Sequence, residues 1–270
     1  MKTLKNHTIL YDAECPMCSL YTRGLAQAGL LDKNGRASYQ EISAGIYATV
    51  DMQRAVNEIA LVNTETGEVT YGIRSLFKVL ANAMPVLGAL FHFGPFVWVM
   101  SKIYAFISFN RRVIVPPTGE AKYMVQPSFK LHYRLFYLFV TWLVTAYILS
   151  RYTLHLKGIL VPGPWYREYF VCGGQILFQG IVAGFYANEK RWTYLGNMMT
   201  ISLAGALLLL PVMWCGKLAG ASPLYFAVGF MGVAFLMFLE HIRRMKILEL
   251  GWLMTVSWIV YRLALLFIIT

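Results

Sequence analysis

The second half of this chain is dominated by long runs of apolar residues. From about residue 131 onward, each run approaches 20 residues, which is the length of a helix that crosses the hydrocarbon core of a bilayer. Backbone groups without hydrogen bonds are costly in lipid, so such runs fold as helices. The five runs lie at 131–150, 169–187, 192–214, 224–239 and 250–269. We therefore expect residues 130–270 to form an all-α transmembrane helical bundle of about five spans.

The composition and charge of the chain agree with a membrane protein. Hydrophobic residues make up 58% of it and aromatic residues 15%, well above the usual soluble composition. The net charge is +11, and most of it belongs to the second half, which after residue 128 contains 12 Lys and Arg residues but only 4 Asp and Glu residues. A basic excess in a membrane domain favours contacts with lipid head groups. We expect membrane lipid as a partner, and no nucleic acid.

The orientation of the chain follows from its flanking charges. Residues 1–20 contain lysines but no continuous apolar core, so they do not resemble a signal peptide. With the N-terminus inside, more of the Lys and Arg near the ends of the apolar runs fall on the cytoplasmic side than outside. We expect an integral membrane protein, in a bacterial inner membrane, with a cytoplasmic N-terminal domain.

Two cysteines in the first half have the spacing of a redox-active dithiol. Cys15 and Cys18 follow a short apolar run at 8–11 and open a stretch, up to residue 31, that is typical of a helix. A thiolate at a helix N-terminus is stabilised by the helix dipole, and Pro16 suits the first turn. Cys15 would then attack and Cys18 resolve. Half of a zinc site and inert structural thiols are the alternatives.

The first 112 residues alternate strand-like and helix-like segments, as in a small α/β domain. After the first strand and helix, we expect a second strand at 38–42, a hairpin at 58–71 turning at Gly67, and a helix at 72–84. This order is typical of a shortened thioredoxin-like fold. Pro116 and Pro117 then mark a linker over 113–129.

One apolar segment, at 86–109, lies before that linker. Gly94 and Pro95 interrupt it and Lys102 lies in its second half, so we expect a helix on the membrane surface or against the α/β domain. The alternative is a sixth span, which would move the C-terminus to the other side of the membrane.

Three short patterns within residues 7–112 resemble those of one family. They are Tyr11-Asp12-x-x-Cys15-x-x-Cys18 after a strand, Tyr71-Gly72 between a hairpin and a helix, and Tyr104-x-x-Ile107-x-x-Asn110-Arg111. In this order they resemble the DCC family, also called DUF393, of thiol-disulfide oxidoreductases. The resemblance implies a thioredoxin-like fold and a dithiol at Cys15 and Cys18, and it says little about the substrate.

Asp12 ends the first predicted strand, directly before the dithiol. A carboxylate there either transfers a proton during disulfide exchange or caps the following helix and its turn. We keep Asp12 as a candidate catalytic residue beside the two cysteines.

The other two cysteines lie in the membrane half. In the five-span topology, Cys172 and Cys215 come out near the same, outer face. They are either a second redox pair or two small buried apolar side chains. A relay between the two pairs would need a carrier such as a quinone. The sequence carries no signature for one, so we expect no cofactor and no metal.

Arg262 lies within the last apolar run. A charge inside a span is costly and by default indicates function, although a long side chain near a helix end can also extend to the interface. Both interpretations stay open from the sequence.

Two functions fit these observations. The first is a membrane-anchored thiol-disulfide oxidoreductase that acts on a protein or small-molecule disulfide. In the second, the membrane bundle is a carrier or a subunit of a membrane complex, and the α/β domain docks partners or senses redox state.

Overall fold

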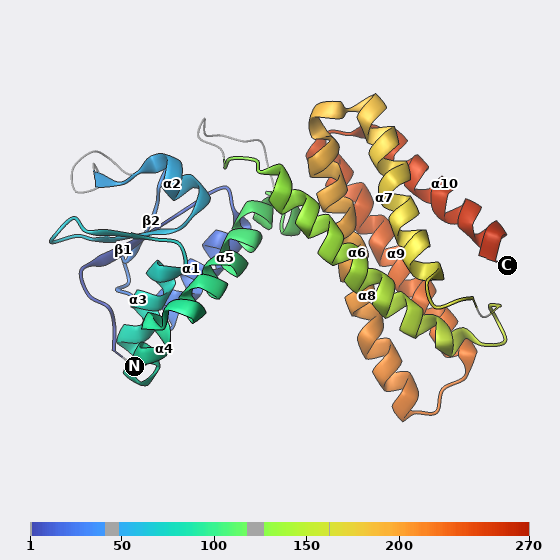
Figure 1. Cartoon of the computed structure of the whole chain (residues 1–270), viewed down its shortest axis with the longest axis horizontal. Helices are drawn as coiled ribbons and strands as arrows, with labels where there is room; N and C mark the ends of the chain where they lie inside the picture. The colour runs from blue at the N-terminus through green and yellow to red at the C-terminus, as the bar shows by residue number, and fades with distance from the viewer. Residues whose placement is uncertain (1, 41–48, 118–126, 162, 270) are drawn as a thin grey trace. The chain divides into compact units, whose positions relative to one another are not determined.

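The computed structural model describes residues 2–40, 49–117, 127–161 and 163–269, with side chains up to residue 265. The chain divides into two compact units, Met1–Tyr133 and Arg134–Thr270 (Figure 1). Part of the predicted second strand (38–42) and part of the predicted linker (113–129) lie outside the described residues.

The first unit contains a four-stranded mixed sheet. Its strands are β1 (His7–Tyr11), β2 (Arg36–Ser38), β3 (Ala60–Asn63) and β4 (Val69–Tyr71), in the order β2-β1-β3-β4. The β1 and β2 strands are parallel, and the β1–β3 and β3–β4 pairs are antiparallel. The predicted hairpin is β3–β4, and Gly67 lies in its turn with φ of +72°. The predicted α/β, thioredoxin-like fold class is confirmed.

Helices cover both faces of this sheet. They are α1 (Pro16–Gln27), which connects the two parallel strands, α2 (Met52–Asn57) and α3 (Ile73–Ala83). Neighbouring residues of a strand point to opposite faces, so the sheet has two cores. Ile9 packs in one core with Val79 of α3, and Leu10 packs in the other with Val56 of α2. This double burial holds the end of β1, and with it the dithiol, in a fixed place.

The ambiguous apolar segment forms two helices with a sharp bend between them. A short turn, η2 (Pro85–Leu87), leads into α4 (Gly88–His92), and α5 (Gly94–Ile114) follows at an angle of 84°. The ring of Phe96 on α5 stacks on that of Phe77 on α3, with 5.6 Å between the ring centroids. The α5 helix thus packs against the α/β domain, which is one of the two positions that the sequence predicted for a helix in this segment. The bent pair taken together is long and apolar enough for one span, and that alternative stays open.

The second unit is made of helices. They are α6 (Leu131–Thr153), which begins just before the unit boundary, α7 (Arg167–Tyr186), α8 (Arg191–Leu218), α9 (Pro223–Leu248) and α10 (Gly251–Ile269), with short turns η3 (Leu154–Leu156) and η4 (Asn188–Lys190). The first four are each long and apolar enough to cross a membrane. The fifth predicted span forms α10, whose described apolar part, Gly251–Leu265, is shorter. The predicted all-α bundle is thus confirmed, with four helices long and apolar enough to cross a membrane and α10 as a shorter apolar helix.

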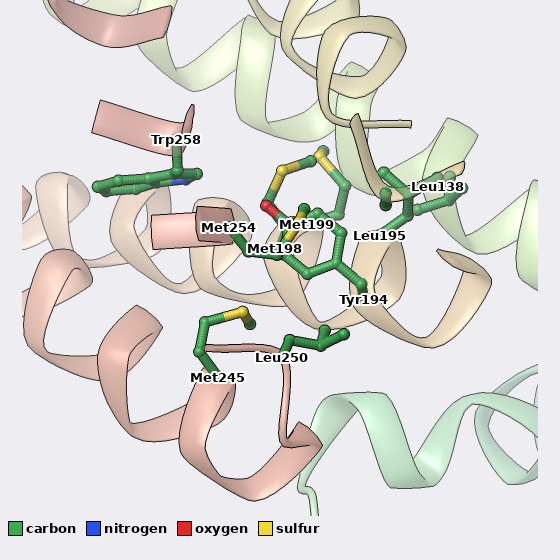
Figure 2. Close-up of a cluster of buried hydrophobic side chains, with 10 residues drawn as sticks. Leu138, Tyr194, Leu195, Met198, Met199, Met245, Leu250, Met254 and Trp258 are labelled. Atoms are coloured by element: carbon green, nitrogen blue, oxygen red, sulfur yellow. The ribbon is translucent and has the colours of Figure 1, made fainter. Parts of the chain in front are cut away.

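The α8 helix lies at the centre of the largest core in this unit. Figure 2 shows Tyr194, Met198 and Met199 of α8 among Met245, from α9, and Met254, from α10. Polar side chains bind the same helices together, since the Tyr194 hydroxyl donates a hydrogen bond to Gln179 of α7 at 2.7 Å. Close packing and such hydrogen bonds hold helices together in lipid.

Candidate functional site

The attacking thiol that the sequence predicts lies at the beginning of α1. Cys15 is the N-cap residue, with an extended backbone (φ −98°, ψ 105°), and Pro16 takes the first helical position. The Cys15 Sγ accepts a hydrogen bond from the backbone N–H of Cys18 at 3.3 Å. A helix N-terminus offers free N–H groups and the positive end of the dipole, which together stabilise a thiolate.

The two thiols differ strongly in acidity. The Cys18 thiol donates a hydrogen bond to the Cys15 sulfur, and this lowers the pKa of Cys15 to about 7, with a further contribution from the positive charge of Arg111; burial acts in the opposite direction. The same hydrogen bond, together with burial, raises the pKa of Cys18 far above its usual value. This geometry favours Cys15 as the nucleophile and Cys18 as the resolving thiol.

The hydrogen bond between the thiols predicts a difference between two substitutions of Cys18. Cys18→Ala removes the donor, so we expect the pKa of Cys15 to rise from about 7 toward 9, the ordinary value. Cys18→Ser keeps a donor and should keep most of the shift. The pH dependence of iodoacetamide alkylation at Cys15, read by peptide mass spectrometry in a Cys172→Ser/Cys215→Ser background, measures this. Equal midpoints in the two variants would contradict the prediction.

Asp12 follows β1 and lies almost fully buried beside the dithiol. Its Oδ1 accepts hydrogen bonds from the backbone N–H of Glu14 at 3.1 Å and from Gln40 Nε2 at 2.8 Å. Its Oδ2 accepts from Arg111 at 3.0 Å and from Arg112 at 3.1 Å. Burial raises the pKa of this carboxyl, but Arg112, Arg111 and Gln40 outweigh it and hold the pKa below its usual value. Asp12 is therefore a carboxylate at neutral pH.

Arg111 connects this carboxylate to the rest of the domain. Its side chain is 7% exposed, and it donates to the carbonyl oxygens of Val56, at 2.7 Å, and Asn57, at 3.2 Å, at the end of α2. A buried guanidinium is tolerated only when it is paired and hydrogen-bonded in this way. Its charge acts on both thiols as well as on Asp12.

These contacts bear on the two roles that the sequence left open for Asp12. The hydrogen bond from Glu14 N–H is that of an Asx turn, and Cys15 itself caps the helix. A carboxylate held by two arginines gives up its charge reluctantly, so the geometry favours a role in orienting Arg111 and closing the turn. Proton transfer by Asp12 stays a prediction.

The dithiol is closed off from solvent. Cys15 is 0% exposed and Cys18 5% exposed, and both are free thiols. The two cysteines are neighbours on one helical turn, so they can form a disulfide with each other once an oxidant reaches one of the sulfurs. Exchange with a substrate disulfide does need access, so the surface above Cys15 has to open during that step.

The candidate residues of the membrane half lie in the second unit. Cys172 is buried in α7, Cys215 is exposed on α8, and both are free thiols. Their pairing stays a prediction. Arg262 lies on α10 with its guanidinium over the ring of Trp258, 4.0 Å from the ring centroid.

The described residues also bear on the metal alternative. Among them, no group of three or more His, Cys, Asp and Glu side chains is placed to hold a metal ion. Cys15 and Cys18 therefore find no further ligand in the part of the chain that the structure describes.

The sequence did not identify the cationic part of this site. Arg111 belongs to the closing Asn-Arg pattern, and Arg112 follows it directly, but both are almost 100 residues from Asp12. Gln40 was missed as well. The available signal was the pair of adjacent arginines at the end of an otherwise apolar helix, where a buried cation needs a carboxylate partner.

Comparison with known protein families gives a match for the first unit. Residues 9–115 match the family model described as DCC1-like thiol-disulfide oxidoreductase. No curated protein and no solved structure matches the chain. The matched range contains the cysteine pair, Asp12 and both arginines, and its sheet and helices have the predicted arrangement. Over residues 9–115, this chain is therefore similar to the DCC1-like thiol-disulfide oxidoreductase family.

Proposed function

We propose that this protein is a membrane-anchored thiol-disulfide oxidoreductase that works through Cys15 and Cys18. The observation that carries the proposal is the position of Cys15 at the N-terminus of α1. There, the hydrogen bond from Cys18 and the positive charge of Arg111 contribute to lowering the pKa of Cys15 to about 7. At neutral pH a large share of Cys15 is then thiolate, the form that attacks disulfides.

The reaction has two exchange steps. The Cys15 thiolate attacks one sulfur of the substrate disulfide, whose S–S bond breaks to give a mixed disulfide and one substrate thiolate. The Cys18 thiol then loses its proton and attacks the Cys15 sulfur, which releases the second substrate thiolate. The substrate disulfide gains two electrons and the Cys15–Cys18 pair loses them. In the reducing cytosol the pair would rest as the dithiol.

The electrostatics of the site support this order of events. The positive charge of Arg111 lowers the pKa of both thiols, whereas the negative charge of Asp12 raises it. When Cys15 enters the mixed disulfide, it ceases to hold the Cys18 proton in a hydrogen bond. The largest influence that raises the pKa of Cys18 then disappears, so Cys18 becomes able to resolve the intermediate.

The membrane half supports anchoring. Four helices are long and apolar enough to cross a bilayer, and α8 is the longest of them. We place the N-terminal domain in the cytoplasm of a bacterial cell, because the flanking Lys and Arg favour that side. An alkaline phosphatase and green fluorescent protein fusion series along the chain tests this placement: active phosphatase on the N-terminus would overturn it.

A redox titration of the full chain in detergent tests the proposed reaction. The protein is equilibrated in glutathione or dithiothreitol buffers and the remaining thiols are labelled and assigned by peptide mass spectrometry. We expect one reversible two-electron couple in which Cys15 and Cys18 lose their label together. Permanently reduced thiols would remove the oxidoreductase proposal and leave the α/β domain as a docking or sensing module of a membrane carrier or complex.

A further inference from the structure

The second unit contains a partly open cavity of about 410 Å³ that the function proposed above does not use. Side chains from five helices, α6 to α10, line it, and most of them are apolar. Small-molecule sites have this size and character, with a few polar groups that orient the ligand. The kind of ligand that fits this cavity therefore depends on its polar groups and on which of them lack a hydrogen-bond partner.

Three polar groups on the lining have no hydrogen-bond partner among the described residues. They are Thr145 Oγ1 on α6, Gln175 Nε2 on α7 and Arg262 Nε on α10. Thr145 is 3% and Gln175 8% exposed. One turn earlier on α6, Thr141 donates to the carbonyl oxygen of Tyr137 at 2.7 Å, so a threonine in this helix readily finds a partner within it. Unpaired polar groups at such depth are costly unless a ligand or a water molecule binds them.

The charge on the lining is also unbalanced. Among the residues that line the cavity, the charged ones are Arg167, Glu168 and Arg262. Arg167 and Glu168 form an ion pair at 2.8 Å, which leaves the charge of Arg262 uncompensated. A lone cation inside an apolar domain is costly unless an anion joins it.

Arg262 does not relieve this cost by extending to the near end of its helix. That nearer end is the C-terminal one, because Arg262 lies seven residues before Ile269, the last residue of α10, which corresponds to about 10 Å along the helix. Its guanidinium carbon lies over the ring of Trp258, one turn back toward the beginning of α10. The side chain therefore points away from the C-terminal end of α10 and stays at the cavity. The structure thus favours the functional interpretation of Arg262 over extension to the interface.

We propose that this cavity binds an amphiphile with one anionic head group and an apolar chain. The head group is a carboxylate or a phosphate: Arg262 pairs with its charge, and Gln175 and Thr145 donate hydrogen bonds to its oxygens. The apolar chain lies along the remaining lining, where Phe230 and Met237 of α9 and Leu209 of α8 supply apolar surface. This inference is independent of the dithiol chemistry.

Binding to the full chain, purified and delipidated in a neutral maltoside detergent, tests the inference. The probes are palmitate, hexadecyl phosphate and hexadecan-1-ol, which share one chain length and differ in the head group. Each displaces a fluorescent fatty acid from the protein. We expect at least one of the two anions to bind about 10- to 100-fold more tightly than the alcohol. Whichever of palmitate and hexadecyl phosphate binds more tightly identifies the head group.

Variants locate the binding. Arg262→Gln should lower the affinity for the preferred anion by about tenfold or more, and Gln175→Leu and Thr145→Val by several-fold each. Thr141→Val is the matched control, because Thr141 is equally buried on the same helix and outside the cavity lining; it should bind as the wild type does. An alcohol that binds as tightly as both anions, or an Arg262→Gln protein that binds them unchanged, overturns the proposal. The comparison of probes on the wild-type protein holds even where a variant does not fold.

Discussion

Replacing Cys15 with serine is expected to abolish disulfide exchange, with a loss of at least about 100-fold in the rate of reduction of a protein disulfide such as that of insulin. The serine hydroxyl stays protonated at neutral pH, where about half of the Cys15 thiol is ionised because its pKa is about 7. The measurement is insulin reduction by the full chain in detergent, with dithiothreitol as the source of electrons. A variant that retains wild-type activity would remove Cys15 from the reaction.

Replacing Cys18 with serine should instead trap the intermediate. The Cys15 thiolate still attacks the substrate, but no second thiol resolves the product, so a mixed disulfide accumulates. Non-reducing electrophoresis and intact-mass spectrometry should detect a one-to-one adduct that dithiothreitol releases. The matched control is Cys172→Ser/Cys215→Ser, which should leave activity and trapping unchanged when Cys15 and Cys18 are present. Adducts at Cys172 or Cys215 would instead make the membrane cysteines the reactive pair.

The elements around the dithiol were predictable because they depend on local sequence. A strand, a cysteine, a proline and a helix in succession define the N-terminus of α1, and the alternation of residues in β1 defines its two buried faces. The ionic partners of Asp12 were not predictable in this way. They belong to the end of α5, almost 100 residues along the chain, and only the folded structure determines which distant cation lies beside a buried carboxylate.

In the membrane half, too, the helices were predictable from the sequence and the contacts between them were not. Length and apolarity identified its helices, since in lipid these two properties determine where a helix forms. They did not identify the cavity or the groups that converge on it. Thr145, Gln175 and Arg262 belong to three different helices, and each alone has an ordinary structural explanation. Their relation follows from helix packing, which apolar periodicity does not encode.

Removing Arg111 is the second change for which we expect a large effect. Arg111→Met keeps the apolar stem but deletes a buried cation, so Asp12 loses one of its two arginines and the carbonyl oxygens of Val56 and Asn57 lose their donor. Breaking a buried pair of this kind costs about 3–5 kcal/mol, and we expect the lower end because Arg112 remains. Urea unfolding of the full chain in detergent, followed by labelling of the buried Cys18 thiol, measures this loss.

The same substitution should weaken the nucleophile. The positive charge of Arg111 lowers the pKa of Cys15, so Arg111→Met should raise it and shift the alkylation midpoint to higher pH. Asp12→Asn should shift the midpoint in the opposite direction, because the charge of Asp12 raises that pKa. Shifts of the alkylation midpoint in opposite directions, from two partners of one ion pair, distinguish an electrostatic effect from general loosening of the domain, which would shift the midpoint of both variants in the same direction.

Arg23→Met, on the exposed face of α1, is the matched control and should change neither the stability nor the alkylation midpoint. If Arg111→Met leaves both quantities unchanged, the cation does not support the thiolate, and the acidity of Cys15 rests on Cys18 and the helix N-terminus alone.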